Sequence, residues 1–405
     1  MGTIDYREPV LDVRPRNSSR KLITASRVGE TNRGRVLEIL HRSGPSSRAE
    51  LARVLSVNRA TIASILQPLI DVGVLVEKPP IAASPAGGKP ARPIWFSRNG
   101  PLLGAVQVSP DFVAAALLGI DGNVRVRASA VYERDADSQT ILSALVEATS
   151  TCFSTADLIG IGVAASGMVK ISTGSIISMH LTPGLNGIEI GRTLEDRFGT
   201  PVLVDHHPRV QALGDLWFGL GRDIEDFASV YTGEALGFGI VHRGSIIRGR
   251  DGAGGESGHT TVQLDGALCR CGRRGCWETV ATLGWLRQKS TELGLDNASE
   301  MTAATLLSQV LDGNTVAAGL MSLYARNLAV GMINNEQILA SGTYIMHGDV
   351  CGGGKPMLEA IQDWMDKLAP ARETNPLVLF ATQPDEITLL GGGGLILSSA
   401  FATVA

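Results

Sequence analysis

The sequence lacks an uninterrupted apolar run long enough to cross a bilayer, which argues against a membrane protein. Its first residues also lack the apolar core of a signal peptide, so we expect a cytoplasmic protein. Cysteine is scarce, with 5 in 405 residues, and three of these lie between Cys269 and Cys276. Such clustering in a reducing compartment favours a metal site over a disulfide scaffold.

Extreme composition is absent as well. Hydrophobic residues make up 44% of the chain and the mean hydropathy is +0.14, as in a globular protein and unlike a disordered one. A chain of 405 residues is long enough for two or three domains with sizeable cores. The overall charge of −4 hides an asymmetry, because residues 1–100 carry a net +8 and residues 101–405 carry a net −12. A basic N-terminal part on an acidic body predicts that only the first part binds a polyanion.

Three cysteines and one histidine provide a complete ligand set for zinc. Cys269, Cys271 and Cys276 follow His259, which lies ten positions before the first of them. Three thiolates and one imidazole fill a tetrahedral shell and leave no place for water, so the ion would be structural. Glycines between the cysteines allow the loop to turn back and the sulfurs to converge. The alternative is a chance cluster of buried thiols.

Residues 1–24 are rich in Arg, Pro and Ser and show no periodicity, which predicts a flexible arm. Residues 25–98 are expected to form a winged helix-turn-helix. A first helix is predicted near 33–41, the capping box at 47–50 opens a second, and Asn58 caps a third whose apolar residues repeat at helical spacing. Two strands, 74–77 and 93–96, flank a Pro/Ala/Gly loop and complete the wing.

The third helix presents small and hydrogen-bonding side chains that suit close approach to base edges in a major groove. Basic residues at the tip of the wing would contact phosphates or the minor groove. The predicted DNA-binding residues are Asn58, Arg59, Thr61, Ser64, Gln67, Lys89 and Arg92. The alternative is a protein–protein module with a solvated hairpin, but the charge asymmetry and the wing favour nucleic acid.

The string Gly-Glu-Ser-Gly-His at 255–259, followed by Cys-Arg-Cys-Gly-Arg-Arg-Gly-Cys-Trp-Glu at 269–278, resembles the signature of the ROK family of sugar kinases and sugar-responsive repressors. In that family these elements hold a zinc ion beside a sugar pocket. Weaker similarity, to repressors of the xylose and N-acetylglucosamine type, extends from about residue 30 to the C-terminus. The resemblance implies that residues 99–405 form a two-lobed actin-like domain with the ligand between the lobes.

From residue 102 onward, short apolar strands alternate with helices, which is an α/β pattern. Strands are expected in 103–120, 158–163, 201–204, 229–241 and 387–390. The glycine run at 391–394 is expected between the last strand and an apolar helix. The glycine-rich stretch at 348–356 lacks the first glycine and the hydroxyl of a phosphate-binding loop, so we interpret it as an ordinary loop.

Kinases of this family use two loops and an acidic base that are altered here. Their Asp-x-Gly-Gly-Thr loop corresponds to Gln-Val-Ser-Pro-Asp at 107–111. Their Gly-Thr-Gly-x-Gly loop corresponds to 233–237, where Glu234 would repel a nucleotide and Ala235 would block close backbone approach. His207 replaces the catalytic Asp. Because phosphoryl transfer depends on positioning and charge stabilisation, these three losses argue against kinase activity.

The resemblance also implies an effector pocket. Its expected residues are Ser166, Gly167, His206, His207, Glu256, His259 and Glu278. The two glutamates and His259 would bind sugar hydroxyls. Because a His-His pair replaces Asn-Asp, the effector is expected to be a phosphorylated sugar, an acidic sugar or a compound outside the sugars. The alternative for the histidines is an exposed pair at the end of a strand.

The sequence thus predicts a zinc-containing transcriptional regulator, a repressor of carbohydrate metabolism or transport. It would bind operator DNA as a homodimer or homotetramer, respond to a small sugar-like effector and lack kinase activity. One alternative is a sugar kinase fused to a DNA-binding domain, and another is a regulator controlled by a protein partner. The operator, the effector and the direction of the response do not follow from the sequence.

Overall fold

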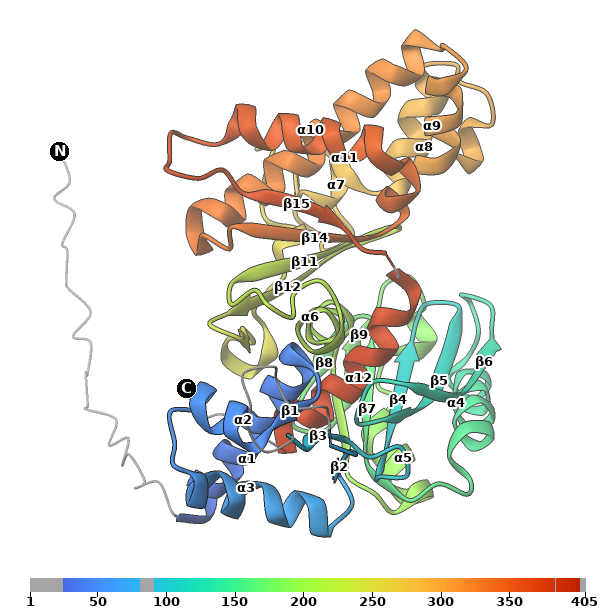
Figure 1. Ribbon diagram of the computed structural model, residues 1–405. Helices are drawn as coiled ribbons and strands as arrows, with labels where there is room; N and C mark the ends of the chain where they lie inside the picture. The colour runs from blue at the N-terminus through green and yellow to red at the C-terminus, as the bar shows by residue number, and fades with distance from the viewer. Residues whose placement is uncertain (1–24, 81–90, 383, 401–405) are drawn as a thin grey trace, which may run out of the picture.

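The protein is described by a computed structural model covering residues 25–80, 91–382 and 384–400. Figure 1 shows two α/β lobes stacked on each other, with a small N-terminal module beside the lower one. We call residues 25–98 the N-terminal module, the lobe beside it the first lobe, and the other the second lobe. The predicted arm at 1–24 and Lys89 at the predicted wing tip lie outside the described residues.

The N-terminal module consists of helices around a small antiparallel sheet whose strand order is β1-β3-β2. Its elements are α1 (Ala25–Ser43), β1 (Ser46–Ser47), α2 (Arg48–Val54), α3 (Arg59–Asp71), β2 (Leu75–Glu77) and β3 (Pro93–Phe96). The predicted capping box is present, because Ser47 accepts a bond from the Glu50 amide while the Glu50 carboxylate accepts one from the Ser47 amide. The short strand β1 was not expected. Fully buried Leu40, Leu51 and Leu66 join the three helices in one core.

The first lobe is built on a five-stranded mixed sheet of order β10-β7-β4-β5-β6. Its main elements are β4 (Leu102–Val108), β5 (Phe112–Gly119), β6 (Val124–Val131), α4 (Ser138–Phe153), β7 (Leu158–Ala165), β8 (Met168–Lys170), β9 (Ser175–Ser178), α5 (Ile190–Phe198), β10 (Val202–His206) and α6 (His207–Phe218). Strands β4, β5 and β6 run antiparallel, whereas β7 and β10 extend the sheet in parallel with β4.

The second lobe repeats this topology in the order β13-β12-β11-β14-β15. Its main elements are β11 (Phe227–Thr232), β12 (Leu236–His242), β13 (Ser245–Ile246), α7 (Glu278–Ala281), α8 (Leu283–Glu292), α9 (Ala303–Leu311), α10 (Thr315–Leu339), β14 (Thr343–Gly348), α11 (Gly354–Leu368) and β15 (Leu377–Phe380). Again three strands run antiparallel and two continue in parallel. The stretch 229–241 is therefore a hairpin, and the mixed α/β prediction is confirmed.

The last helix corrects two expectations. Residues 387–390 are not a strand, and Gly391–Gly394 do not precede the helix, because both stretches lie inside α12 (Pro384–Ala400). A short apolar run does not distinguish a buried helix from a buried strand. The glycines are needed because a Cβ at Gly391 would lie 1.9 Å from the Val210 carbonyl oxygen of α6, and one at Gly392 would lie 2.7 Å from the Gly162 carbonyl oxygen of β7. The helices therefore pack almost backbone to backbone.

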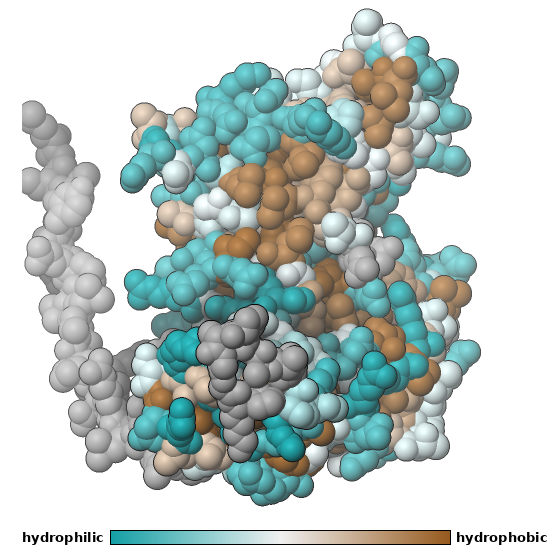
Figure 2. All heavy atoms as spheres, in the orientation of Figure 1, coloured by the Kyte–Doolittle hydropathy of each residue, from teal (hydrophilic) through white to brown (hydrophobic). Residues whose placement is uncertain are grey.

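Two further stretches differ from expectation. Within 348–356, Asp349–Gly353 forms a 3-10 turn and α11 begins at Gly354, so the stretch is only partly loop. Helix α10, with 25 residues, is long and apolar enough by length and composition to cross a membrane, contrary to the expectation from the sequence. Its apolar residues, including Leu320, Leu328 and Met332, lie in the core of the second lobe, as in the central helix of a globular domain. Figure 2 shows other apolar residues gathered at the waist between the lobes.

Candidate functional site

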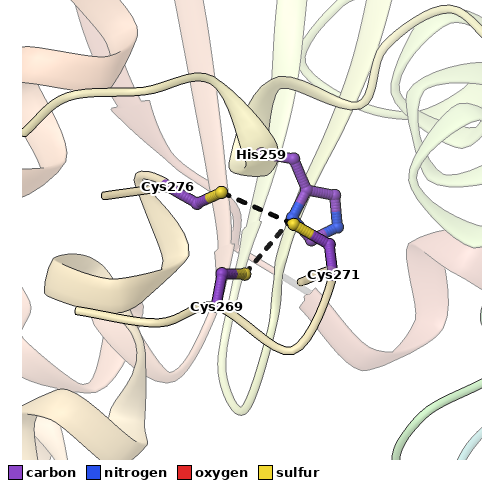
Figure 3. Close-up of side chains that lie close together, drawn as sticks. All are labelled: His259, Cys269, Cys271 and Cys276. Atoms are coloured by element: carbon purple, nitrogen blue, oxygen red, sulfur yellow. Dashed lines mark hydrogen bonds between the residues drawn. The ribbon is translucent and has the colours of Figure 1, made fainter. Parts of the chain in front are cut away.

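A tight loop brings three cysteines towards one histidine. His259 ends a 3-10 turn at Ser257–His259, and isolated bridges pair Thr261 with Cys276 and Leu268 with Arg274. The turn requires glycine at position 275, where φ is +70° and a Cβ would lie 1.5 Å from the Gln263 carbonyl oxygen. The loop thereby folds back on itself as the sequence predicts, and the four side chains face one another in Figure 3.

The four candidate ligand atoms converge, and two pairs of them have the separation found in a tetrahedral metal shell. They all lie within 4.8 Å of one another. The Sγ atoms of Cys271 and Cys276 are 3.6 Å apart, and Cys269 Sγ lies 3.6 Å from His259 Nδ1. Zinc with its usual bond lengths places neighbouring sulfur and nitrogen ligands about 3.5–3.8 Å apart. The donor set and its spacing therefore fit zinc, and every tetrahedral position would be filled by protein.

The thiols differ in acidity. Burial raises the pKa of Cys269 and raises that of Cys276 to about 12. Burial also acts to raise the pKa of Cys271, but hydrogen bonds from Arg273, Cys276 and Cys269 lower it to about 6. A cation bound here must displace the protons of the more basic thiols, so its binding would strengthen as pH rises.

Two carboxyl groups and one further imidazole, that of His206, lie beside this cluster. Glu278 begins α7; its Oε1 accepts a bond from the Leu236 amide at 3.0 Å, and its Oε2 lies 3.7 Å from His259 Nδ1. His206, at the end of β10, places Nδ1 3.5 Å from Glu256 Oε1. The contact joins the first lobe to the loop that carries the cluster. The structure thus brings four of the predicted effector residues together.

Burial shifts the pKa of two of these groups, Glu256 and His206, towards the neutral form. Burial raises the pKa of Glu256, even though His259 and Arg209 act to lower it. Burial lowers the pKa of His206 to about 3, with a further contribution from the neighbouring Arg209 cation. Carboxyl groups and imidazoles that accept or donate hydrogen bonds suit the hydroxyl groups of a polar ligand.

The sequence did not single out Asp205, whose carboxylate organises the same pocket. It is 1% exposed, with Oδ1 2.7 Å from Arg209 Nε and Oδ2 2.8 Å from Arg248 Nε. Arg209 also donates to the Gly254 carbonyl oxygen at 3.0 Å. This network ties the strand that bears His206 to the loop before Glu256. The i, i+4 spacing of Asp205 and Arg209 was a signal in the sequence, but their position across a strand–helix junction concealed it.

The remaining predicted effector residues are placed differently. Ser166 and Gly167 follow β7, and β7 pairs with β10 so that Ala165 lies opposite His206. They therefore share the same sheet edge, and a Cβ at Gly167 would lie 2.5 Å from the Ser178 carbonyl oxygen. His207 is 8% exposed, which excludes an exposed histidine pair.

His207 points inward, towards the second lobe and α12. Its ring lies edge-on to Tyr231, with the centroids 5.0 Å apart, and Nε2 is 3.4 Å from Thr388 Oγ1. Burial lowers its pKa to about 4. Of the two histidines, His206 is therefore the one that faces Glu256.

In the two stretches that correspond to the nucleotide loops of family kinases, polar side chains are paired with the protein's own groups. In the β4–β5 loop, Gln107 donates to Ser109 Oγ at 3.1 Å, and Asp111 pairs with Arg134 at 3.2 Å. In the β11–β12 turn, Glu234 Oε1 lies 2.6 Å from Arg287 Nη1. The Glu234 carboxylate is thus paired with a cation, and the expected repulsion of a nucleotide by Glu234 stays a prediction.

The predicted DNA-reading residues lie on α3 and before β3. Arg59, Ser64 and Gln67 are exposed, Thr61 is half-buried, and Arg92 is exposed next to β3. Two of the polar groups already have intrahelical partners: Ser64 donates to the Thr61 carbonyl oxygen, and Gln67 donates to Asp71 at 2.8 Å.

Asn58 caps α3 by accepting a bond from the Thr61 amide at 2.8 Å. Its side-chain oxygen is therefore committed to the helix and is not free to read a base.

A separate groove lies on the second lobe. It has a volume of about 500 Å³ and lies between the start of the cysteine loop, α8 and α10, where Trp285, Lys289 and Arg326 contribute to its wall. None of the predicted effector residues lines it.

Comparison with known proteins places this architecture. The ROK family model matches residues 104–398. Among curated proteins, the chain is 25% identical to a putative xylose repressor of Caldicellulosiruptor sp. (strain Rt8B.4), covering 88% of this chain and 92% of the relative. It is 26% identical to the DNA-binding transcriptional dual regulator NagC of Escherichia coli, covering 91% and 93%. It is also 30% identical to a glucokinase of Halalkalibacterium halodurans, but over only 60% of this chain and 77% of that enzyme.

Solved structures show the same fold. A ROK family transcriptional regulator, a homologue of the Escherichia coli MLC protein, superposes with a TM-score of 0.76 at 22% identity and covers 92% of this chain and 97% of its own. A ROK family glucokinase from Streptomyces griseus in complex with glucose and AMPPNP gives a TM-score of 0.64 at 24% identity, covering 73% and 98%. Since the family model matches most of the sequence, this chain belongs to the ROK family.

Proposed function

We propose that this protein is a DNA-binding transcriptional repressor of carbohydrate metabolism or transport. It is controlled by a sugar-like effector, contains a structural zinc ion and has no kinase activity. Residues 25–98 form its winged helix-turn-helix DNA-binding domain. Residues 99–405 form a two-lobed actin-like body that binds the effector and supplies a homodimer or homotetramer. We infer a cytoplasmic location from the DNA target.

The observation that carries this proposal is the joining of the N-terminal module to a ROK body in one chain. The two Caldicellulosiruptor xylose repressors and NagC match 87–91% of this chain, whereas the glucokinase relative matches 60%. The module has a helix α3 with an exposed polar face and a strand pair beside it. It also lies in the part of the sequence, residues 1–100, that carries a net positive charge. A helix of this kind with a flanking β-wing fits a major groove.

The four-residue cluster supports a structural role for zinc. When bound, the ion would join His259 to the cysteine loop and so fix the start of α7, where Glu278 lies. All four tetrahedral positions are provided by protein, so the ion would have no coordination site for substrate or water. Zinc would therefore act on effector binding only by holding these residues in place.

The chemistry of the pocket supports a polyhydroxylated effector. Carboxylates at Glu256 and Glu278 and an imidazole at His206 come from both sides of the site. Carboxylates accept hydrogen bonds from hydroxyl groups, and a neutral imidazole can both accept and donate one. The guanidinium of Arg248, bound to Asp205, adds a cation near the same loop and is compatible with an acidic or phosphorylated sugar.

The altered sequences of the two nucleotide loops argue against phosphoryl transfer. Backbone amides of a glycine-rich loop normally cradle the phosphates. Here the corresponding positions carry the Asp111–Arg134 and Glu234–Arg287 ion pairs. The base position carries His207, which faces Tyr231 and Thr388. With neither cradle nor acidic base, ATP would lack the groups that position and stabilise its γ-phosphate.

The decisive experiment selects DNA with the purified full-length protein. A random-sequence duplex pool would be enriched over several rounds, and the selected duplex would be titrated with and without D-xylose, N-acetylglucosamine, glucose and their phosphate esters. We expect one enriched motif and a change in affinity with one compound. Failure to enrich any duplex would contradict the proposal. In parallel, ATP-dependent turnover of these sugars above the no-protein background would favour the alternative, a sugar kinase fused to an N-terminal module.

A further inference from the structure

The N-terminal module contacts the first lobe through a cluster of rings. His41, in the last turn of α1, has its ring centroid 4.2 Å from that of Phe96, 5.5 Å from that of Trp217 and 5.2 Å from that of Phe218. Phe96 belongs to the module, whereas Trp217 and Phe218 are the last two residues of α6. We call these four residues the ring junction. One continuous apolar core runs through it from the module into the first lobe.

The other end of α6 lies at the effector residues. Its N-cap is His206, which contacts Glu256, and its third residue Arg209 holds Asp205 and the Gly254 carbonyl oxygen. A helix of twelve residues spans about 18 Å. A single buried helix therefore links the candidate effector pocket directly to the ring junction.

Helix α6 is packed closely against α12 and is hydrogen-bonded to the second lobe. A Cβ at Gly214 would lie 2.0 Å from the Ile387 carbonyl oxygen of α12, and Trp217 donates to Ser398 of α12 at 2.8 Å. In the second lobe, His347 Nε2 lies 2.8 Å from Asp215 Oδ2, and Ser229 donates to the same carboxylate. Because both lobes hold α6, a change in their relative position must act on this helix.

We propose that α6 carries the regulatory signal of this protein. A change at the effector pocket, at the N-terminal end of α6, alters the placement of the N-terminal module through the ring junction, and His41 is the positioning residue. The inference rests on the proposed function and specifies how the effector controls DNA binding. Close-packed interiors rearrange between discrete states instead of deforming gradually, so a small shift of α6 is transmitted to the rings.

The chemistry of His41 supports this role. It is 7% exposed, and its Nε2 has no hydrogen-bond partner among the described residues. Burying an unpaired polar atom costs stability that an apolar ring would retain. The junction is therefore not arranged for stability alone. The module also contacts α6 and α12 through α1, and Arg125 of the first lobe donates to the Arg98 carbonyl oxygen of the module at 3.3 Å.

Linkage provides a test that does not require the effector to be known. If the pocket controls the module, then DNA bound to the module must change the pocket to the same thermodynamic extent. We would measure hydrogen exchange by mass spectrometry on the full-length protein, with and without a duplex that it selects from a random pool. In the wild type, exchange of residues 207–218 and 248–259 should change several-fold when the duplex binds.

Two variants interrupt the junction, and one control does not. In His41→Ala, the duplex should still alter exchange in residues 59–71, while the change at 248–259 is lost. Phe218→Leu keeps an apolar side chain and provides the milder second variant, with the same expected loss. Phe153→Leu removes a buried ring that contacts Phe198 in the first lobe, away from α6, and should leave the wild-type response intact.

The outcomes separate the two hypotheses. A duplex that binds without changing exchange at 207–218 and 248–259 in the wild type contradicts the coupling alone. If the change in exchange at 248–259 persists in both junction variants, that result also contradicts the coupling alone. A protein that enriches no duplex contradicts the proposed function, and with it the coupling to DNA.

Discussion

Single side chains determine whether the cysteine loop has a defined shape. Cys269 and Cys276 are buried and belong to the four-residue cluster, whereas Cys152 is a buried thiol outside it that donates to the Ala115 carbonyl oxygen. A Cys→Ser change is therefore expected to remove zinc at a cysteine of the cluster and to leave zinc in place at Cys152. The two classes of cysteine also provide a matched pair for a test of zinc.

Cys276→Ser should remove the ion. We expect about one zinc per chain in the wild type and in Cys152→Ser, and close to none in Cys276→Ser. Loss of a metal ligand from a closed shell should lower the stability by about 2–4 kcal/mol. Metal analysis and thermal unfolding check both points. A wild-type protein that folds without zinc and with free thiols would show that the cluster is only a group of core cysteines.

A second prediction at this scale concerns His41 and pH. Burial, with the nearby Arg222, lowers the pKa of His41 from 6.5 to about 3. The unfolded chain therefore binds a proton below pH 6.5 that the folded chain does not, so stability falls as pH falls towards 3. Between pH 7 and pH 5 this histidine alone should cost about 2 kcal/mol.

His41→Phe should reduce that loss. Urea unfolding at pH 7 and pH 5 measures it in both proteins. An equal loss of stability in wild type and variant would mean that His41 does not remain neutral in the fold.

At the scale of elements, the distinction between an effector sensor and a sugar kinase depends on the β4–β5 loop, the β11–β12 turn and His207 at the start of α6. Asp111 in the β4–β5 loop and Glu234 in the β11–β12 turn stand where the family's phosphate-binding loops have threonine, and each is paired with an arginine. Each was identified in the sequence by comparison with the family pattern. Their partners, Arg134 and Arg287, became apparent only in the structure.

We therefore expect that His207→Asp will not create a kinase. The change restores an acid at the base position, but ATP would still lack both cradles. The double variant Glu234→Gly/His207→Asp should also be inactive, because the β4–β5 loop would still lack the glycines of the family pattern. An ADP-release assay with hexoses, pentoses and amino sugars measures this. Clear turnover by the single variant would show that the base was the only missing part.

At the scale of the molecule, a basic module is attached to an acidic body. The first hundred residues carry a net +8 and the remainder a net −12. Such a chain should meet DNA in one orientation, because the body repels the phosphates that attract the module. Exposed Arg59 and Arg92 lie on the side of the module that carries α3 and β3.

The affinity for the selected duplex should therefore fall steeply with salt. Released counterions make the logarithm of the binding constant linear in the logarithm of the salt concentration. Arg92→Ala should weaken all sequences and reduce that slope by about 1, whereas Gln67→Ala should change base preference at a cost of about 1–3 kcal/mol. Titrations at several salt concentrations with selected and scrambled duplexes separate the two effects. Equal effects of both variants on both duplexes would mean that α3 does not read the bases.

The sequence determined local features whose signals are short. The Ser47 and Asn58 caps, the β2 and β3 strands and the mixed α/β pattern follow from spacing and propensity within a few residues, and all are present. The cysteine cluster was equally accessible, because its four ligands lie within eighteen residues and zinc requires them to converge. The family signature added the fold of the body, which periodicity does not specify.

Only the tertiary structure decided features that depend on residues far apart in the chain. Residues 387–394 lie in a helix although glycine disfavours one. The glycines are there because α6 and β7 lie too close for a Cβ, and no local signal records that distance. Asp205 binds Arg248, forty-three positions away, and His41 meets Trp217 across the junction between the module and the first lobe. Packing between distant segments sets these contacts. The pocket and its link to the module therefore emerge only when the chain is folded.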